Sequence, residues 1–334
     1  MEKVLEKLAT FLPLASLLLI LVPAASPAQG EFLRLLGPSI GGQKARASYK
    51  WELYDKRTIS GREADLDLTQ HDLSLSIPIA QDADREWSLS ATQGIHDVDT
   101  RACFPHTGEL LPGTLQDIST GLTHRRLVKG RRIAGGHLSV GSASDRPFEG
   151  MDETTVQAMG FLRIPDKETN AWFFFVAYSN NREFLNHVPL PGCAYWYAPS
   201  RRFSLILGIP FVTLTLRPTD DTSLSLSYFA IHTVRGSAKY QILQKLGLFA
   251  TFSWTNQAYY RADRLHHFDR IFYYEKRIST GVTINLPREF IVEIAGGYSF
   301  DRFYFEAEDY DERNRNRLDV EGGSFLSLNL RAHF

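Results

Sequence analysis

The chain has 334 residues, and its 37 basic side chains nearly balance its 38 acidic ones, so charge gives no case for binding to nucleic acid. Phe, Tyr and Trp supply 12% of the residues, a content that suits the aromatic girdles of membrane barrels. No uninterrupted apolar run reaches the ~18 residues that a membrane-spanning helix needs, so a helical membrane protein is not expected.

The first 28 residues are predicted to be a signal peptide, followed by one domain over residues 29–334. Two early lysines precede an apolar stretch over residues 11–22, and small side chains lead up to Ala28, where a signal peptidase would cut. Cleavage after Ala25 is the alternative. An anchor helix that stays attached is another interpretation of the same stretch.

Beyond residue 42, segments in which apolar and polar side chains alternate are separated by short polar turns and by longer connections, in turn. Because successive side chains of a strand point to opposite faces, this alternation predicts strands with one apolar face. An even number of strands would leave both termini on one side, with short turns toward the periplasm and long loops outward. Twelve strands remain an alternative, since residues 236–243 are poorly patterned. Fourteen segments are predicted, over residues 43–55, 65–79, 85–96, 115–128, 131–142, 153–164, 170–180, 200–217, 222–233, 236–243, 246–261, 270–286, 289–304 and 323–334.

Two of these segments depart from simple alternation. Leu66 and Leu68 have one parity, whereas the apolar residues from Leu73 onward have the other, so we expect a β-bulge near Gln70. The run over residues 172–176 is apolar on both faces, which indicates an interior plug, a narrow lumen or an aromatic cluster at the rim.

The last strand has the clearest pattern, with its polar side chains on one face and Leu326, Leu328, Leu330, Ala332 and Phe334 on the other. A soluble sandwich strand would show the same alternation. A closing strand that ends in Phe, in a chain that starts with a secretion signal, resembles bacterial outer-membrane β-barrel proteins. In those proteins the last strand typically ends in Phe and is read by the barrel-assembly machinery.

This resemblance implies an all-β fold, a transmembrane antiparallel β-barrel. It also implies a location in the outer membrane of a Gram-negative-type bacterium, with the lipid bilayer and the assembly machinery as partners. The physical reason for closure is that hydrocarbon offers no hydrogen-bond partner to the amides of an open sheet edge.

A second resemblance rests on residues 298–306 after Gly296-Gly297, together with Gly208-Ile209-Pro210 and residues 216–220. These stretches are similar to a family of uncharacterised bacterial outer-membrane proteins, a domain of unknown function, over residues 150–334. The resemblance implies the same fold and location, and no activity or site residues. The glycine pair itself is interpreted as relieving crowding in a curved strand.

Charged side chains on the polar faces are candidates for lining a lumen. Opposite charges across a lumen orient water and set an ion preference, but ion pairs that fill a narrow interior would use the same residues. Because about fourteen strands enclose more space than side chains fill, we expect a partly filled pore and porin-like passive passage of small solutes. The candidates are Arg163, Arg217, Lys239, Glu293, Asp301 and Arg331.

Two other functions remain open. His96, Asp97 and Asp99 at the outer end of a strand make a weak case for a hydrolase at the rim, against a plain solvated loop edge. A structural or adhesive barrel would instead work through its outer loops, above all the charged residues 305–322.

Neither a metal nor a cofactor is expected. His266 and His267 are adjacent in an expected outer loop, close to Asp269, and are candidates for binding a transition metal; because adjacent residues of a strand face opposite ways, a shared metal would need the loop conformation. Cys103 and Cys193 both fall in predicted loops of an exported protein, where they form either a disulfide or two unpaired thiols.

Overall fold

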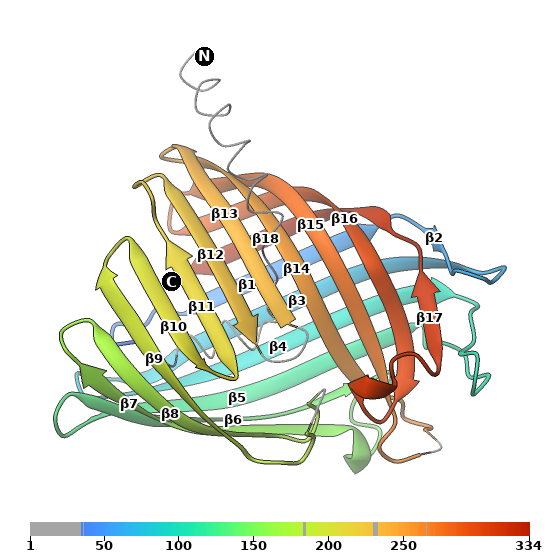
Figure 1. Ribbon diagram of the computed structural model, residues 1–334, viewed down its shortest axis with the longest axis horizontal. Helices are drawn as coiled ribbons and strands as arrows, with labels where there is room; N and C mark the ends of the chain where they lie inside the picture. The colour runs from blue at the N-terminus through green and yellow to red at the C-terminus, as the bar shows by residue number, and fades with distance from the viewer. Residues whose placement is uncertain (1–34, 36, 183–184, 230–232, 265) are drawn as a thin grey trace.

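The computed structural model describes residue 35 and residues 37–334, apart from 183–184, 230–232 and 265. The predicted signal peptide and its cleavage site lie outside the described residues. Within the described part of the chain, 16 antiparallel strands form one closed barrel (Figure 1). Their bounds are β1 (Arg46–Tyr54), β3 (Asp65–Gln81), β4 (Arg85–Thr100), β5 (Thr114–Val128), β6 (Arg132–Ser144), β7 (Thr154–Asp166), β8 (Asn170–Ser179), β9 (Leu190–Ser200), β10 (Phe203–Ile209), β11 (Phe211–Leu216), β12 (Thr222–Phe229), β13 (Thr233–Leu243), β14 (Leu246–Tyr260), β15 (Arg270–Leu286), β16 (Phe290–Ala307) and β18 (Gly323–His333).

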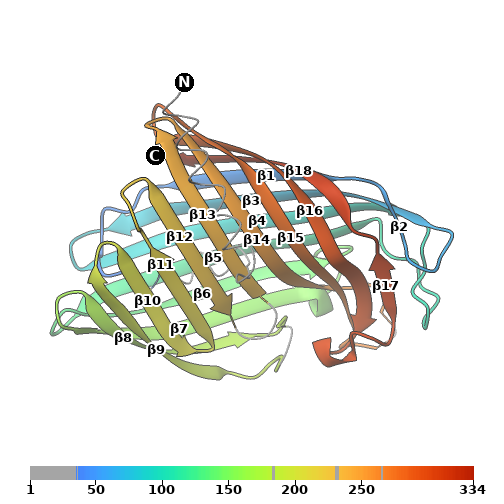
Figure 2. The same cartoon turned by 45° about the horizontal axis from the view of Figure 1, so that its top comes forward.

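Two short strands, β2 (Arg57–Thr58) and β17 (Arg317–Val320), and two short 3-10 helices, η1 (Met151–Glu153) and η2 (Tyr310–Glu312), belong to the longer connections. We call the end of the barrel with β2 and β17 the loop end. The opposite end, which carries the short turns and the C-terminus, is the turn end (Figure 2). No helix in the described residues is long and apolar enough to cross a membrane.

The first and last strands close the barrel. β1 pairs with β18 from Arg46↔His333 to Tyr54↔Phe325, and its other edge pairs with β3. Neither edge of β1 is therefore left open. The side chains of Leu326, Leu330 and Phe334 point outward and are exposed, as the alternation of the last strand predicts. The fold class predicted from the sequence is confirmed by this closure.

The predicted strand count was wrong, because residues 190–216 form three strands where one was predicted. β9 lies where a loop was expected, since Pro191, Gly192 and Pro199 interrupt its pattern. The predicted single strand over residues 200–217 is a hairpin of β10 and β11, which turns at Pro210. The doubtful segment near residues 236–243 is a full strand, β13, paired on both edges, so the alternative of twelve strands is also wrong.

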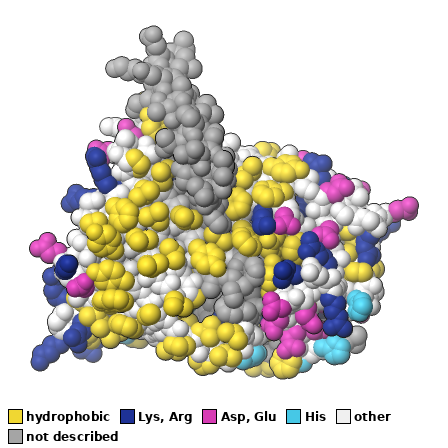
Figure 3. All heavy atoms as spheres, in the orientation of Figure 1, with side chains coloured by type: hydrophobic (Ala, Val, Ile, Leu, Met, Phe, Trp, Pro, Cys, Tyr) yellow, Lys and Arg dark blue, Asp and Glu magenta, His cyan; other side chains and the backbone are white. Residues whose placement is uncertain are grey.

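An apolar band covers the outside of the barrel. Along β3 it comprises Leu73, Leu75, Ile77 and Ile79, all exposed. Figure 3 shows apolar side chains gathered over the centre and the turn-end half of this face, while charged side chains crowd the loop end. An exposed apolar band of this kind needs hydrocarbon rather than water around it.

At the loop end the polarity of the wall is reversed. Leu66 and Leu68 of β3 point inward and are buried, whereas Asp67 on the same stretch points outward. β3 stays in regular register with β4 from Leu66 to Pro78, so the predicted bulge near Gln70 was wrong. The change of parity among the leucines reflects a change of surroundings rather than an extra residue.

One side of the barrel wall is low. β10, β11 and β12 have 7, 6 and 8 residues, whereas β15 and β16 have 17 and 18. Past this low wall the loop-end tips of β6 and β14 meet directly: Ser144 pairs with Tyr260, and the amide of Ala262 donates to Asp145 Oδ1 at 2.8 Å. The barrel therefore narrows toward its loop end by bypassing seven strands, β7 to β13 (Figures 1 and 2).

Candidate functional site

The described side chains leave room in the middle of the barrel. Asp117 of β5 and both Arg235 and Lys239 of β13 have inward parity, yet all three are exposed. A side chain that points into a closed barrel stays exposed only where the interior leaves room for water. The candidate functional site is this hollow zone, which we call the lumen.

Three of the predicted lumen residues meet there. Lys239 Nζ lies 3.3 Å from Glu293 Oε1, and Arg331 forms an ion pair with the same carboxylate. Asn329 Nδ2 donates to Glu293 Oε2 at 3.0 Å. Strands β13, β16 and β18 thus combine two cations with one anion, so this wall of the lumen carries a positive excess.

The other three predicted lumen residues lie elsewhere. Arg163 points inward on β7 but is buried over the ring of Phe173, 5.8 Å from its centroid. Arg217 follows β11 at the turn end, where its backbone N–H bonds to Arg202. The lumen position predicted for Asp301 is wrong, because its carboxylate accepts from Lys276 Nζ at 2.6 Å on the outer face.

A bulge explains the error at Asp301. Tyr274 pairs with Phe303, and Lys276 pairs with Phe300, so β16 has one residue more than β15 between these pairs. Asp301 is the extra residue and has a positive φ of 50°. Parity along β16 changes at this point, and Arg302 turns inward in its place.

Sequence reasoning missed the most buried charged cluster, on β1 and β15. Arg277 Nη1 lies 2.7 Å from Glu52 Oε2, 2.8 Å from Tyr54 Oη and 3.6 Å from Glu275 Oε2. Lys50 Nζ lies 2.5 Å from Glu52 Oε2. Parity places each of these residues inside, but only the curvature of the barrel brings β15 against β1 across two intervening strands.

A hydrophobic core closes the lumen toward the loop end. It includes Leu66, Leu68, Leu115, Tyr259 and Tyr304, which come from strands on opposite sides of the barrel. We call this cluster the cap. Because its side chains fill the interior, the loop end of the narrowed barrel has no straight polar path through it within the described residues.

The residues of the proposed rim hydrolase are separated by the barrel wall. His96 is buried in the cap, with its ring 5.0 Å from that of Tyr273 and 5.6 Å from that of Tyr259. Asp97 points outward, 3.9 Å from His71 Nε2, and Asp99 shares its parity. Adjacent strand residues face opposite ways, so His96 and these carboxylates do not share one site.

The expected outer loop over residues 305–322 is mostly part of the folded wall. Glu306 is buried against Arg261, whose Nε lies 2.8 Å from Glu306 Oε1. Tyr310 packs on Phe305, and Leu318 of β17 belongs to the cap. The segment therefore stabilises the loop end and is not a free outer loop.

Inside the low wall the lining is apolar. Phe173 and Phe175 of β8 point inward and pack with Phe211 and Leu35, while their sequence neighbours Trp172 and Phe174 face outward. The run that is apolar on both faces thus fills part of the interior.

The segment before β1 reaches into the same region. The Arg125 guanidinium donates to the carbonyl of Gly37, and the amide of Gly41 donates to Glu86 Oε2 at 2.8 Å. Lys44, at the turn end, donates to Glu289 and thereby lowers the pKa of that carboxyl. Apolar side chains therefore fill the lumen along β6 to β11, and the segment before β1 fills it beside β4 and β5, whereas room remains around Asp117, Arg235 and Lys239.

The cysteines and histidines in the described part of the chain form neither a disulfide nor a metal centre. Of the two alternatives for the cysteines, the structure has the unpaired thiols: Cys103 lies in the β4–β5 connection and Cys193 is exposed on β9. His267 Nδ1 lies 3.5 Å from Asp152 Oδ2, and the described residues contain no group of three His, Cys, Asp or Glu side chains that would hold a metal.

Neither a family model nor a curated protein matches the chain, so the family expected from residues 150–334 is not shown. Among solved structures, an outer membrane channel from Pseudomonas putida F1 is 9% identical, with a TM-score of 0.38, over 89% of this chain and 97% of that one. The Pseudomonas putida toluene transporter TodX is 8% identical, with a TM-score of 0.37, over 93% and 94%. OccK7 (OpdD) of Pseudomonas aeruginosa is 11% identical, with a TM-score of 0.36, over 87% and 99%. Likenesses at this level carry no argument about activity.

Proposed function

We propose that this protein is an outer-membrane channel that passes small polar solutes or ions through a narrow, charged lumen. The observation that carries the proposal is the set of inward yet exposed charges, Asp117, Arg235 and Lys239. The outward apolar band and the closed ring of strands support insertion into a bilayer, where only closed barrels satisfy every strand amide. Phe334 remains the proposed assembly signal at the end of β18.

Opposite charges on the two walls give the lumen an electrostatic character. Asp117 of β5 lies on one wall, and Arg235 and Lys239 of β13 lie on the opposite wall. Between these walls only β1 separates Arg331 of β18 from Asp72 of β3, whose Oδ2 lies 3.8 Å from Lys50 Nζ. A solute between the walls would experience a field across its path, which orients dipoles and selects ions by sign. The surplus of cations over Glu293 favours anions.

The cap sets the route. Since the core at the loop end fills the narrowed part of the barrel, passage straight along the barrel axis is blocked. We place the way out over the low wall of β10 to β12, below the junction of β6 and β14, past the apolar side chains of Phe175 and Phe211 that line it. A solute would therefore turn sideways after crossing the charged zone.

Planar-bilayer recording of the purified protein tests the proposal. We expect small single-channel currents with anion preference, and a shift of the reversal potential toward cations in Lys239→Gln in a KCl gradient. Lys276→Gln is the matched control, because Lys276 lies on the outer face over the ring of Trp254, 5.0 Å from its centroid. Absence of current, or an equal shift in the control variant, would contradict a conducting lumen.

A further inference from the structure

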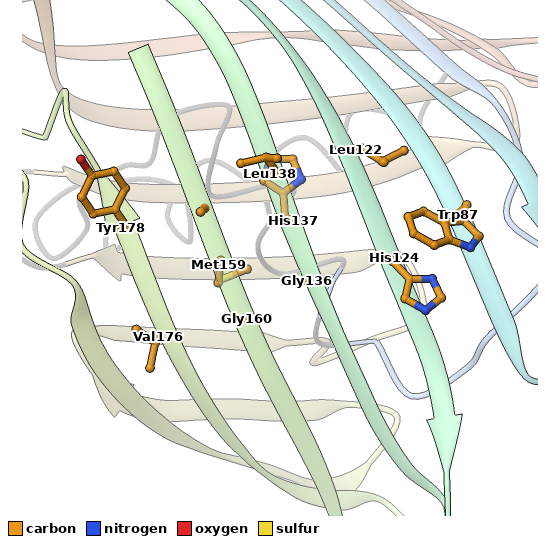
Figure 4. Close-up of a pocket in the computed structure, with 11 residues that line it drawn as sticks. Trp87, Leu122, His124, Gly136, His137, Leu138, Met159, Gly160, Val176 and Tyr178 are labelled. Atoms are coloured by element: carbon orange, nitrogen blue, oxygen red, sulfur yellow. The ribbon is translucent and has the colours of Figure 1, made fainter.

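A groove of about 610 Å³ runs across the outer, lipid-facing surface of β4 to β8 (Figure 4). Leu122, Leu138 and Val176 border it and are exposed, with 40%, 52% and 51% of their surface accessible. The volume lies within the ~300–1,000 Å³ typical of small-molecule sites. The groove therefore has room for part of a lipid-sized molecule.

Small residues make the floor of the groove. Gly136 pairs with Gly160 on the neighbouring strand, and Ala158 lies next to them. A Cβ atom added at Gly160 would have no heavy atom within 4 Å. Large apolar side chains occupy the neighbouring outward positions at Leu122, Leu138 and Val176, so this depression arises from the small residues between them.

Aromatic rings form one end of the groove. Trp87 of β4 and His124 of β5 stack with their ring centroids 4.1 Å apart. Trp prefers the level at which hydrocarbon gives way to headgroups. This end of the groove thus lies toward the turn end of the barrel, at the boundary of the apolar band.

Cations lie directly beyond these rings on the same outer face. Arg85 and Arg126 are opposite each other on β4 and β5, and Arg132 of β6 pairs with Val128, two residues beyond Arg126 toward the turn end. All three are exposed. Arg85 Nε lies 2.8 Å from Asp82 Oδ2, whereas the side chains of Arg126 and Arg132 have no ion-pair or hydrogen-bond partner among the described residues.

This arrangement of cations favours the binding of an anion. Like charges directly opposite on neighbouring strands destabilise a sheet, and here two of the three guanidinium groups lack a counter-charge. A phosphate that accepts from Arg126 and Arg132 would remove the repulsion and use the planar donors of arginine. The groove above offers the apolar surface that an acyl chain of the same molecule needs.

We propose that the groove and these arginines bind one glycerophospholipid with an anionic headgroup. An acyl chain lies across Gly136 and Gly160, between the Trp87 end and Val176, and the phosphate lies between Arg126 and Arg132. The site does not involve the lumen, so it stands or falls separately from the proposed channel activity.

Native mass spectrometry of the purified protein, incubated with equal amounts of dioleoyl-phosphatidylglycerol and dioleoyl-phosphatidylcholine, tests the proposal. We expect a retained adduct with phosphatidylglycerol in preference to phosphatidylcholine. Because each arginine near a headgroup favours an anionic lipid about fivefold, Arg126→Gln with Arg132→Gln should reduce the preference to near unity. This double variant alters exposed side chains and leaves the barrel intact.

Gly160→Leu should remove the adduct of both lipids, because its Cβ meets no heavy atom within 4 Å and the rest of its side chain would occupy the groove. Gly296→Leu is the matched control on the outer face of β16, where a Cβ would lie 3.9 Å from Leu326. Equal binding of the two lipids by the unaltered protein would overturn the proposal. So would a dimer that disappears in Gly160→Leu, since the groove would then be an interface with a second copy of the chain.

Discussion

The two ends of β3 lie in opposite surroundings. Near the turn end Leu73, Leu75 and Ile77 face outward into the apolar band, and the polar side chains between them face the lumen. Near the loop end Leu66 and Leu68 face inward into the cap, and polar side chains face out. One strand, in regular register from Leu66 to Pro78, thus belongs to a membrane wall at one end and to a water-soluble core at the other.

The difference shows that alternation indicates which side chains share a face of the strand. It does not indicate whether that face meets lipid, water or the protein interior. In hydrocarbon the apolar face must point out, and in water it must point in. A strand that extends beyond the bilayer therefore exchanges its apolar and polar faces while its geometry stays constant. Substitutions can test each end of β3, because the same change should cost a different free energy of unfolding in the two environments.

The largest effect is expected inside the barrel, in the charged cluster on β1 and β15. Arg277→Met should lower the free energy of unfolding by ~3–5 kcal/mol, because Glu275 would stay buried without its ion-pair partner and Glu52 would keep only Lys50. Urea unfolding in micelles measures it. Arg202→Met at the turn end breaks only an exposed pair with Asp220 and should have little effect. A similar loss in both variants would show that the cluster is not enclosed.

A smaller effect separates the two halves of β3 directly. Leu68→Ala should cost ~2–5 kcal/mol, because it leaves a cavity in the cap. Leu75→Ala removes the same atoms from the exposed band, where acyl chains occupy the vacated space, so its cost should be clearly lower. Unfolding of both variants in the same lipid gives the comparison. Equal costs would mean that the cap is loosely packed.

The closed barrel could be predicted because lipid imposes a strong pattern on each strand. Fewer strands were expected than the structure contains, since β9 has two prolines and a glycine, and the β10–β11 turn at Pro210 has no polar residue to mark it. The β10–β11 turn lies in the low wall, and β9 lies next to it. There the strands are short and alternation has few residues in which to appear.

The site was predicted only in part for a related reason. Lys239, Glu293 and Arg331 meet because their strands are regular up to that level. Asp301 was misplaced by one extra residue, which reverses parity for the rest of β16. The pairing of Arg277 with Glu52 depends on the curvature of the whole barrel, which the sequence of a single strand does not reveal.

The smallest effect would locate the boundary between the two halves. Arginine on the lipid face of a barrel costs ~2–4 kcal/mol at the bilayer midplane and ~0–1 kcal/mol near the interface. Leu75→Arg should therefore be costly, and Thr69→Arg, six residues toward the loop end on the same outward face, nearly neutral. Unfolding in bilayers of one thickness measures both. If Thr69→Arg costs as much as Leu75→Arg, the bilayer extends to the level of the cap, and the inward leucines of β3 need a cause other than a change of solvent.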